Sequence, residues 1–163
     1  LLRKLLNDEI KSMMRRNLVK SRSFADMLEK TILKYQNRTI EAAQVILELL
    51  ELAKKMKMEK EEGKKLGLSE DEIAFYDALC VNESAIAELG DKTLKQMARE
   101  LVEMLRKNTT IDWTIKENVQ ARLRVYVKKL LRKYHYPPDK QESATQTVLE
   151  QANLLCKDWS GGN

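Results

Sequence analysis

Helix-breaking residues are scarce in this sequence and occur at only a few places. The chain has 163 residues, of which 5 are Gly and 2 are Pro. Good helix formers such as Leu, Lys, Glu and Ala fill the long intervals between these breakers. No run alternates between apolar and polar residues for long enough to predict a strand. We therefore expect an all-α fold, a bundle of about six or seven helices in a single domain over residues 1–163.

The N-terminal part of the chain predicts two helices. Apolar residues recur at three- and four-residue spacing through residues 1–20, which indicates the first helix. Ser23 and Asp26 resemble a capping box, so the next helix is expected to start just after Ser23. Because no Gly or Pro interrupts it, one long helix over Phe24–Glu62 is permitted. Its apolar stripe steps by four and three residues, as in a helix that lies along another helix: Tyr35, Thr39, Ala42, Ile46, Leu49, Ala53 and Met56.

Local signals divide the rest of the chain into shorter helices. Gly63 and Gly67 can stop the long helix. The SEDE sequence at residues 69–72 predicts a capping box and a helix that begins at Glu70. Asn82 and Gly90 flank a further short turn, and Asp91 is expected to cap the helix that follows.

The Pro137-Pro138 pair separates the last two helices. The final helix is expected to start at Asp139 and to bury one side chain per turn, namely Ala144, Val148, Ala152 and Leu155. Residues 160–163 are expected to form a disordered tail.

The helix before Pro137 carries the most distinctive surface in the sequence. Thr114 and Glu117 can form its capping box, with Trp113 packed against its entry. Its expected apolar stripe contains Ile115, Val119, Leu123, Tyr126, Val127, Leu130 and Tyr134, with Leu131 at the margin. The opposite face is basic and forms the candidate contact surface for a partner or for DNA: Arg122, Arg124, Lys128, Lys129, Arg132 and Lys133.

Three interpretations of this basic face remain open. Lysine and arginine on an outer face are the ordinary way to dissolve a helix, or they can pair with acidic groups of the same chain. The same cations can dock a protein partner, and the apolar Ala121 and Val125 within the basic arc favour docking slightly. They can also neutralise DNA phosphates. Aromatic residues interleaved for base stacking are missing, because Tyr126 and Tyr134 fall on the apolar side.

Charge is distributed unevenly along the chain, whose formal net charge is +5. Residues 1–38 carry a local charge of +6, and residues 108–136 carry +5. The intervening residues 39–107 carry −4. Two basic blocks therefore bracket an acidic middle, which indicates internal complementarity, an acidic partner or nucleic acid. One observation best separates these interpretations, namely whether the acidic residues between Glu59 and Glu72 cover the basic face.

The sequence offers no recognisable catalytic or cofactor-binding constellation. His135 is the only histidine, and Cys80 and Cys156 are isolated, so zinc ligation is not expected and both cysteines are interpreted as buried thiols. Gly63-Lys64 lacks the upstream glycines and the following hydroxyl of a phosphate-binding loop. No apolar run approaches the roughly 20 residues that span a bilayer. We expect a fragment that is not an enzyme, binds no cofactor itself and does not enter a membrane.

Several segments resemble the C-terminal helical region of the R subunit, the restriction and motor subunit, of type I restriction-modification enzymes. The first two are NLVKSRSFADMLEKTILKYQNRTIEAAQVILELLELAK and LGLSEDEIAFYDAL. The third runs from residue 110 to residue 155 and contains IDW, ARLR, LLRKY and YPPDK in the family's order. One departure is His135, where the family pattern has Gly before Tyr-Pro-Pro. Because Gly suits a left-handed helix cap, His135 is expected to change how that helix ends.

This resemblance implies a larger parent protein. It would be an ATP-dependent DNA translocase fused to a nuclease, a site-specific deoxyribonuclease of the cytoplasm of a bacterium or archaeon. ATP and Mg²⁺ would act in its upstream nuclease and motor domains, and none of the family's catalytic residues match a position here. The C-terminal domain would dock the motor subunit onto the methyltransferase core of M and S subunits. The alternatives are a basic domain that guides duplex DNA to the motor and a folding brace for the motor domains.

Overall fold

The computed structural model describes residues 1–108 and 117–161, and within these ranges the chain forms helices joined by short turns, without a strand. The prediction of an all-α bundle is therefore confirmed for the described part of the chain. The helices, in order, are α1 (Leu2–Met14), α2 (Leu18–Gln36), α3 (Ala42–Lys65), α4 (Glu70–Leu79), α5 (Glu83–Asn108), α6 (Glu117–Lys133), the short 3₁₀ helix η1 (Pro138–Lys140) and α7 (Gln141–Gly161).

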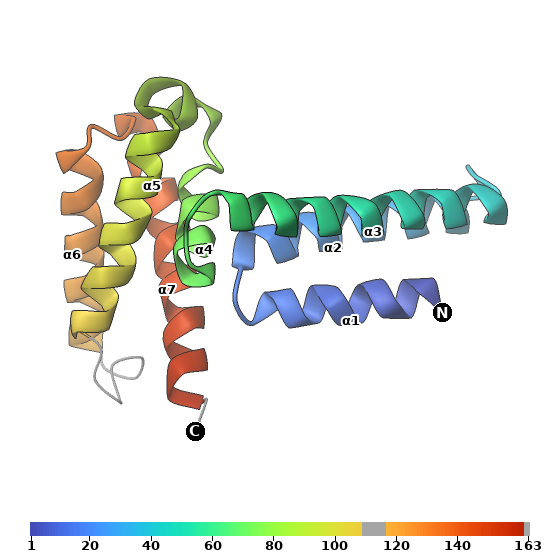
Figure 1. Ribbon diagram of the computed structural model, residues 1–163, viewed down its shortest axis with the longest axis horizontal. Coiled ribbons are helices and arrows are strands. Elements are labelled where there is room, and N and C mark those ends of the chain that lie inside the picture. The colour runs from blue at the N-terminus through green and yellow to red at the C-terminus, as the bar shows by residue number, and fades with distance from the viewer. Residues whose placement is uncertain (109–116, 162–163) are drawn as a thin grey trace.

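The helices form two parts with separate hydrophobic cores (Figure 1). Helices α1, α2 and α3 run alongside one another as an arm, which projects sideways from a C-terminal bundle of α4, α5, α6 and α7. The core of the arm is small, with Phe24, Leu28, Leu49 and Met56 among its eight buried residues. The bundle has the larger core, and all four side chains expected to be buried on α7 are 1% exposed or less. Most of the hydrophobic stabilisation therefore belongs to the bundle.

The expectation of one long helix over Phe24–Glu62 is wrong, because the chain turns back between α2 and α3. Arg38 takes a left-handed conformation, with φ at 56°. The amide of Arg38 donates to the Tyr35 carbonyl at 3.0 Å, and the amide of Thr39 donates to Lys34 at 2.8 Å. These two bonds form a Schellman ending without glycine. A straight rod would leave the apolar faces of both halves in water, whereas the hairpin buries them against each other, and this gain outweighs the cost of about 1–2 kcal/mol for a left-handed residue.

The start of α2 also differs from the expectation. Asn17, rather than Ser23, is the N-cap, and its side chain accepts a hydrogen bond from the Lys20 amide at 3.1 Å. Ser23 lies inside α2 and is exposed. Asn17 also donates to Asp77 of α4 at 2.7 Å, so the true cap is selected by a contact with the bundle as well as by local geometry.

Several other boundaries follow the local signals, although α7 begins at Gln141, after the 3₁₀ helix η1, instead of at Asp139, and it extends to Gly161. Ser69 and Glu72 form the expected capping box at the start of α4. Gly67 has φ at +73° and follows the end of α3, whereas Gly63 lies buried within α3. Gly90 interrupts α5 with φ at 80°, which separates a short turn from the longer helix as expected. The expected capping box at Thr114 lies outside the described residues.

One buried amide joins the arm to the bundle. Gln151 of α7 is completely buried. Its Nε2 donates to the main-chain oxygen of Arg16 at 2.7 Å, and its Oε1 accepts from the amide of Leu18 at 2.8 Å. Beside it, Lys20 lies 3.4 Å from Asp77. The short segment between α1 and α2 is therefore fixed onto the bundle by polar contacts.

Candidate partner-binding surfaces

Helix α6 is held in the bundle by one face, and its basic face points outward. Leu123, Val127 and Leu131 are buried at 4% exposure or less. The buried stripe is thus centred nearer to Leu131 than expected, and Tyr126, which was expected in the stripe, is 41% exposed. The expected and the observed buried faces of α6 thus differ by a small rotation about the helix axis. The sequence pattern alone does not fix this rotation, because it depends on the helices against which α6 packs.

The end of α6 is fixed by the residue that departs from the family pattern. His135 takes the left-handed conformation, with φ at 58°, and the amide of Tyr136 donates to the Leu131 carbonyl at 2.9 Å. His135 therefore closes the helix as a glycine would. The Tyr136 side chain is fully buried, and its hydroxyl donates to the Leu79 carbonyl at 2.7 Å and accepts from Asn82 at 3.0 Å. This anchor fixes the chain just after α6 to the end of α4 and the turn that follows it.

Three of the six candidate basic residues contact acidic groups of the bundle. Lys128 lies 3.3 Å from Glu142, and Arg124 lies 4.0 Å from the same carboxylate. Lys133 lies 3.6 Å from Glu100, whose carboxylate also accepts a hydrogen bond from Tyr134. That hydrogen bond raises the pKa of Tyr134 to about 12, so this hydroxyl stays protonated near neutral pH.

The other three basic residues, Arg122, Lys129 and Arg132, are exposed and have no ion-pair partner among the described residues. The acidic residues between Glu59 and Glu72 do not pair with this face. Glu70 instead pairs with Arg16 at 2.5 Å, and Asp71 pairs with Arg106 at 3.2 Å. The basic face of α6 is therefore open to solvent over much of its length.

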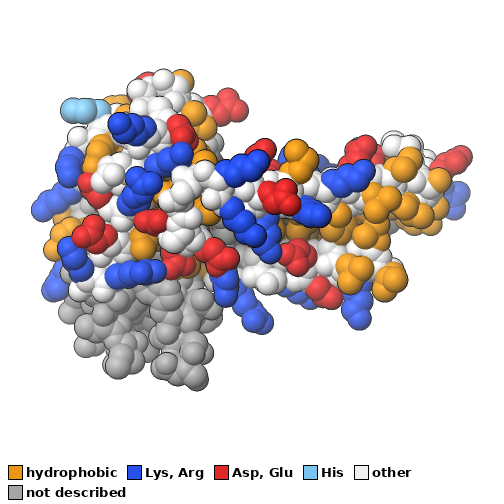
Figure 2. Space-filling view, viewed as in Figure 1, with side chains coloured by type: hydrophobic (Ala, Val, Ile, Leu, Met, Phe, Trp, Pro, Cys, Tyr) orange, Lys and Arg blue, Asp and Glu red, His pale blue; other side chains and the backbone are white. Residues whose placement is uncertain are grey.

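The arm carries a second surface that we did not identify from the sequence. Thirteen large apolar side chains are exposed in the described part of the chain, and nine of them belong to the arm: Leu1, Leu5, Met14, Leu33, Tyr35, Ile46, Leu47, Leu50 and Met58. On the face shown in Figure 2, apolar side chains gather between α3 and α1 toward the free end of the arm. The sequence did contain a signal, because Ile46 and Ala53 belong to the predicted helix-contact stripe.

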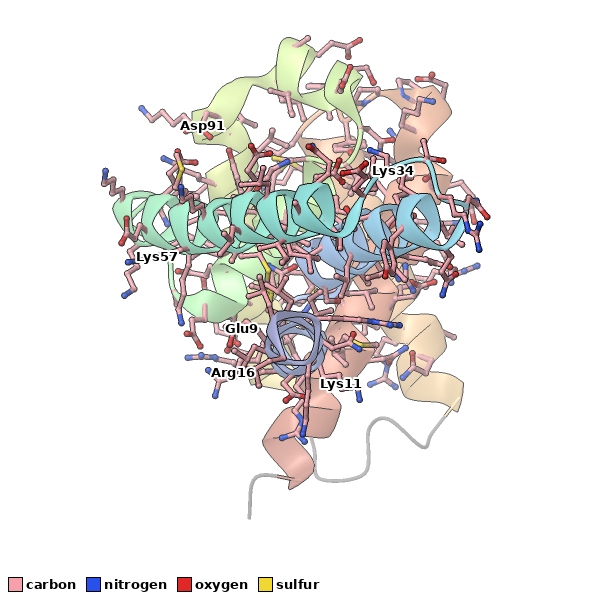
Figure 3. All side chains as sticks on the ribbon, turned by 90° about the vertical axis from the view of Figure 1, so that its right-hand side faces the viewer. Glu9, Lys11, Arg16, Lys34, Lys57 and Asp91 are labelled. Carbon is pink, nitrogen blue, oxygen red and sulfur yellow. The ribbon has the colours of Figure 1, made fainter. Side chains whose placement is uncertain are left out.

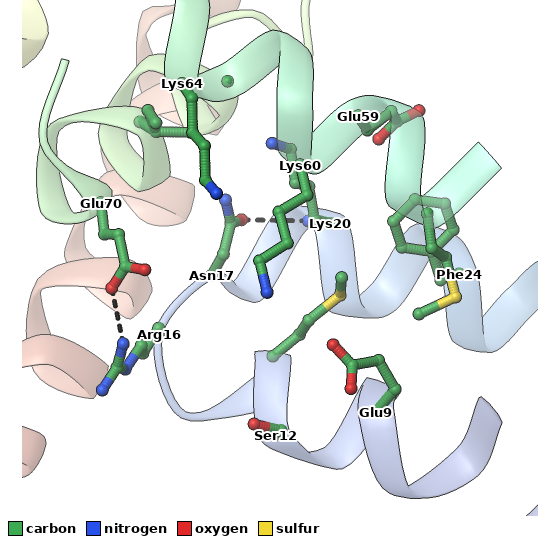
Figure 4. Close-up of a pocket in the computed structure, with 14 residues that line it drawn as sticks. Glu9, Ser12, Arg16, Asn17, Lys20, Phe24, Glu59, Lys60, Lys64 and Glu70 are labelled. Atoms are coloured by element: carbon green, nitrogen blue, oxygen red, sulfur yellow. Dashed lines mark hydrogen bonds and ion pairs between the residues drawn. The ribbon is translucent and has the colours of Figure 1, made fainter. Parts of the chain in front are cut away.

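A pocket of about 340 Å³ lies between the C-terminal halves of α1 and α3 (Figure 4). Its floor is α2, and α4 closes it at the bundle end. The lining residues used below are Glu9 of α1, Arg16 of the turn that follows α1, and Glu59, Lys60 and Lys64 of α3. Its charged lining differs from the apolar surface at the free end of the same two helices.

The described residues contain no group of three or more His, Cys, Asp or Glu side chains that could hold a metal ion. Cys80 is a free thiol, and burial raises its pKa to about 11, which keeps it protonated and poorly nucleophilic at neutral pH. The side chain of Cys156 lies outside the described residues. No helix in the described part of the chain is long and apolar enough to cross a membrane.

Comparison with known proteins supplies the family. Residues 1–158 match the family described as type I restriction enzyme HindI endonuclease subunit-like, C-terminal. The type I restriction enzyme HindI endonuclease subunit of Haemophilus influenzae is 40% identical over 156 residues, which are 96% of this chain and 15% of that protein. A Methanocaldococcus jannaschii protein, provisionally named as the MjaIXP endonuclease subunit of a type I restriction enzyme, is 37% identical over 131 residues, or 80% of this chain and 12% of its own length. No solved structure matches the chain.

Proposed function

We propose a function on the premise that this chain belongs to the family of type I restriction enzyme HindI endonuclease subunit-like C-terminal domains. In this proposal it is an assembly domain, which attaches the endonuclease subunit to the methyltransferase core of M and S subunits. It contributes to DNA restriction only within that complex, in the cytoplasm of a bacterium or archaeon. Nuclease and ATP-dependent motor chemistry belong to other parts of the parent subunit.

The observation that carries this proposal is the concentration of exposed apolar side chains on the arm. A thin arm of three helices that leaves Leu5, Ile46 and Leu47 more than half exposed places apolar surface in water at a cost in free energy. Exposed apolar patches of this kind mark protein–protein contact sites. The arm also projects away from the bundle, so a large partner can reach it without displacing the bundle (Figure 1).

The proposal is tested by binding of the 163-residue chain to a purified M–S core. We expect a stable complex on size-exclusion chromatography, and competition by the chain against the full endonuclease subunit for the core. If the full endonuclease subunit binds the core while this chain neither binds nor competes, attachment resides elsewhere in the parent protein.

A second candidate function is DNA contact through the basic face of α6. The observation that favours it is the exposure of Arg122, Lys129 and Arg132 without ion-pair partners in the described part of the chain. Helix α6 lies on the side of the bundle away from the arm (Figure 1), so a contact of α6 with DNA leaves the arm accessible to a partner. In this version the chain guides duplex DNA toward the motor.

The DNA contact is tested by duplex binding at several salt concentrations. If these side chains neutralise phosphates, binding should weaken steeply as the salt concentration rises. The logarithm of the association constant should fall against the logarithm of salt concentration with a slope of about −0.9 per phosphate contact. Changing Arg122, Lys129 and Arg132 to Glu is expected to abolish the binding. Absence of any salt-sensitive binding at low ionic strength removes this candidate and leaves the assembly function untouched.

A further inference from the structure

The arm has the arrangement of a four-helix bundle from which one helix is missing. Helix α2 packs closely on both α1 and α3, whereas α1 and α3 make few contacts with each other. Viewed from the free end of the arm (Figure 3), α2 lies on one side of α1 and α3, and Glu9 and Lys57 lie on the other side. The pocket lies on this open side, between α1 and α3. A fourth position is therefore open along the arm.

On α3, two stripes of side chains run side by side. The first, at positions 45, 49, 52 and 56, is buried against the other arm helices. The second follows the same alternation of four- and three-residue steps one position later, which places it next to the first on the helix surface. Its members are Ile46, Leu50, Ala53, Lys57, Lys60 and Lys64. Ile46 is 54% exposed and Leu50 is 44% exposed, and Lys60 and Lys64 line the pocket.

Helix α1 repeats this arrangement. Its buried stripe contains Leu6 and Ile10. A second stripe beside it steps by three and four residues and contains Leu2, Leu5, Glu9 and Ser12, and Arg16 follows in the turn just after the helix. The last three of these line the pocket, and Leu5 is 58% exposed. Because α1 and α3 run in the same direction from the free end, the apolar parts of both second stripes lie at that end, and the charged parts lie next to the bundle.

We propose that the groove between α1 and α3 receives one amphipathic α-helix of the methyltransferase core, apolar at the free end of the arm and acidic toward the bundle. This inference rests on the proposed function, since that function supplies the partner. The two second stripes present side chains at the three-to-four spacing that accepts the knobs of a facing helix. An inserted helix would complete a four-helix arm.

The charge of the groove selects an acidic helix. Lys57, Lys60 and Lys64 follow one another along α3 and have no ion-pair partner among the described residues. On the α1 side Arg16 is neutralised by Glu70, at 2.5 Å, which leaves Glu9 as the acidic group of that stripe. Glu59 of α3 also lines the pocket, so three unpaired lysines face two carboxylates, Glu9 and Glu59, and the bundle end of the groove keeps a small excess of positive charge. Carboxylates on the α3-facing edge of the inserted helix would neutralise it.

The groove combines apolar and charged side chains, and this favours a helix of a separate subunit as its occupant over a permanently attached segment. Obligate interfaces resemble a protein core cut in half, whereas interfaces between independently stable partners contain more charge. Here the apolar part is confined to a few side chains, among them Leu5, Ile46 and Leu50, and the other half is lysine-rich. Such a surface remains soluble before assembly and still offers a buried anchor after it.

The first test measures binding of the whole chain to the purified M–S core by isothermal titration calorimetry. Ile46→Glu and Leu50→Glu, and separately the triple change of Lys57, Lys60 and Lys64 to Glu, are each expected to weaken binding about tenfold or more. Matched controls are Val81→Glu, at a bundle position that is 52% exposed, and a triple change to Glu on the basic face of α6. The controls are expected to change binding less than about twofold. Because all changed side chains are exposed, circular dichroism should show the wild-type helical content.

The second test uses two synthetic helical peptides that share one apolar face and differ only in flanking residues, Glu in one and Lys in the other. The wild-type chain is expected to bind the Glu-flanked peptide more tightly, and the triple lysine-to-glutamate variant to prefer the Lys-flanked one. A variant damaged only in folding would bind both peptides worse and would not reverse the preference.

The outcomes separate this inference from the proposed function. If the wild-type chain binds the core and the groove variants bind equally well, the groove is not the docking site, although the assembly function stands. If the chain fails to bind the core yet shows the reversible peptide preference, the assembly function fails and the helix chemistry of the groove stands. A dimer of the chain in analytical ultracentrifugation that is lost in Ile46→Glu would assign the groove to a second copy and overturn the proposed occupant.

Discussion

The junction between arm and bundle gives the sharpest prediction, because one fully buried amide, Gln151, bonds the main chain of the arm on both sides of Asn17. Replacing Gln151 by Leu keeps a side chain of similar volume in a fully buried site, so no cavity of consequence forms. The change removes both partners of the arm main chain, namely the acceptor for the Leu18 amide and the donor for the Arg16 carbonyl. Each buried polar group left without a partner costs about 1–3 kcal/mol.

Because the junction is only part-buried, water can partly replace the lost partners, and we expect a total loss of about 2–3 kcal/mol of unfolding free energy. This is a large share of a typical domain stability of about 5–15 kcal/mol. The matched control is Gln146→Leu, an exposed glutamine on the same helix, for which a change within about 0.5 kcal/mol is expected.

The variant Gln151→Glu adds a test of the donor. A carboxylate at this site can still accept from Leu18, but it turns an oxygen toward the Arg16 carbonyl, and burial opposes its ionisation. The folded pKa of the introduced carboxyl should therefore lie above its unfolded value of about 4.3. Its contribution to stability is present below that unfolded pKa and is lost as pH rises through the folded pKa, so the variant should be least stable at neutral pH.

Two measurements check this reasoning. Urea unfolding followed by circular dichroism gives the free energies at pH 4 and pH 7, and hydrogen exchange gives the protection of the Leu18 amide. If Gln151→Leu unfolds at the wild-type urea midpoint and the Leu18 amide keeps its protection, the amide does not hold the junction and the argument from buried polar groups is refuted.

Three further predictions concern the same framework. His135→Gly should raise the unfolding free energy by about 0.5–1 kcal/mol, because glycine adopts the left-handed conformation without the steric cost that histidine bears; a lower urea midpoint would contradict this. Tyr136→Phe should lower the unfolding free energy by about 1–3 kcal/mol, since the Leu79 carbonyl loses its donor in the core, and equal thermal stability would contradict this. Burial raises the pKa of Asp77 despite the nearby Lys20, so the stability of the wild type relative to Asp77→Asn should fall as the pH rises above the unfolded pKa of about 4. Urea titrations at several pH values measure this, and a rise in relative stability would show that the lysine dominates.

Local hydrogen bonding and side-chain spacing could be predicted from the sequence with success. The capping box at Ser69, the interruption at Gly90 and the buried side chains of α7 all depend on residues within four positions of each other. Such relations are fixed by helix geometry and need no knowledge of the rest of the chain. The basic face of α6 was predicted on the same basis, and its contact with a partner or with DNA stays a prediction.

The sequence by itself thus determined that the chain is helical, where many of its helices begin, and which side of α7 is buried. Tertiary structure alone decided that the chain turns back at Arg38, that Asn17 caps α2, and that Gln151 joins the arm to the bundle. The physical reason is one of magnitude and distance. A left-handed arginine or a choice between two caps changes the local free energy by only about 1–2 kcal/mol, so burial of apolar faces from segments far apart in sequence decides the outcome. The open groove between α1 and α3 has the same origin, because two helices must pack on α2 before a fourth position exists.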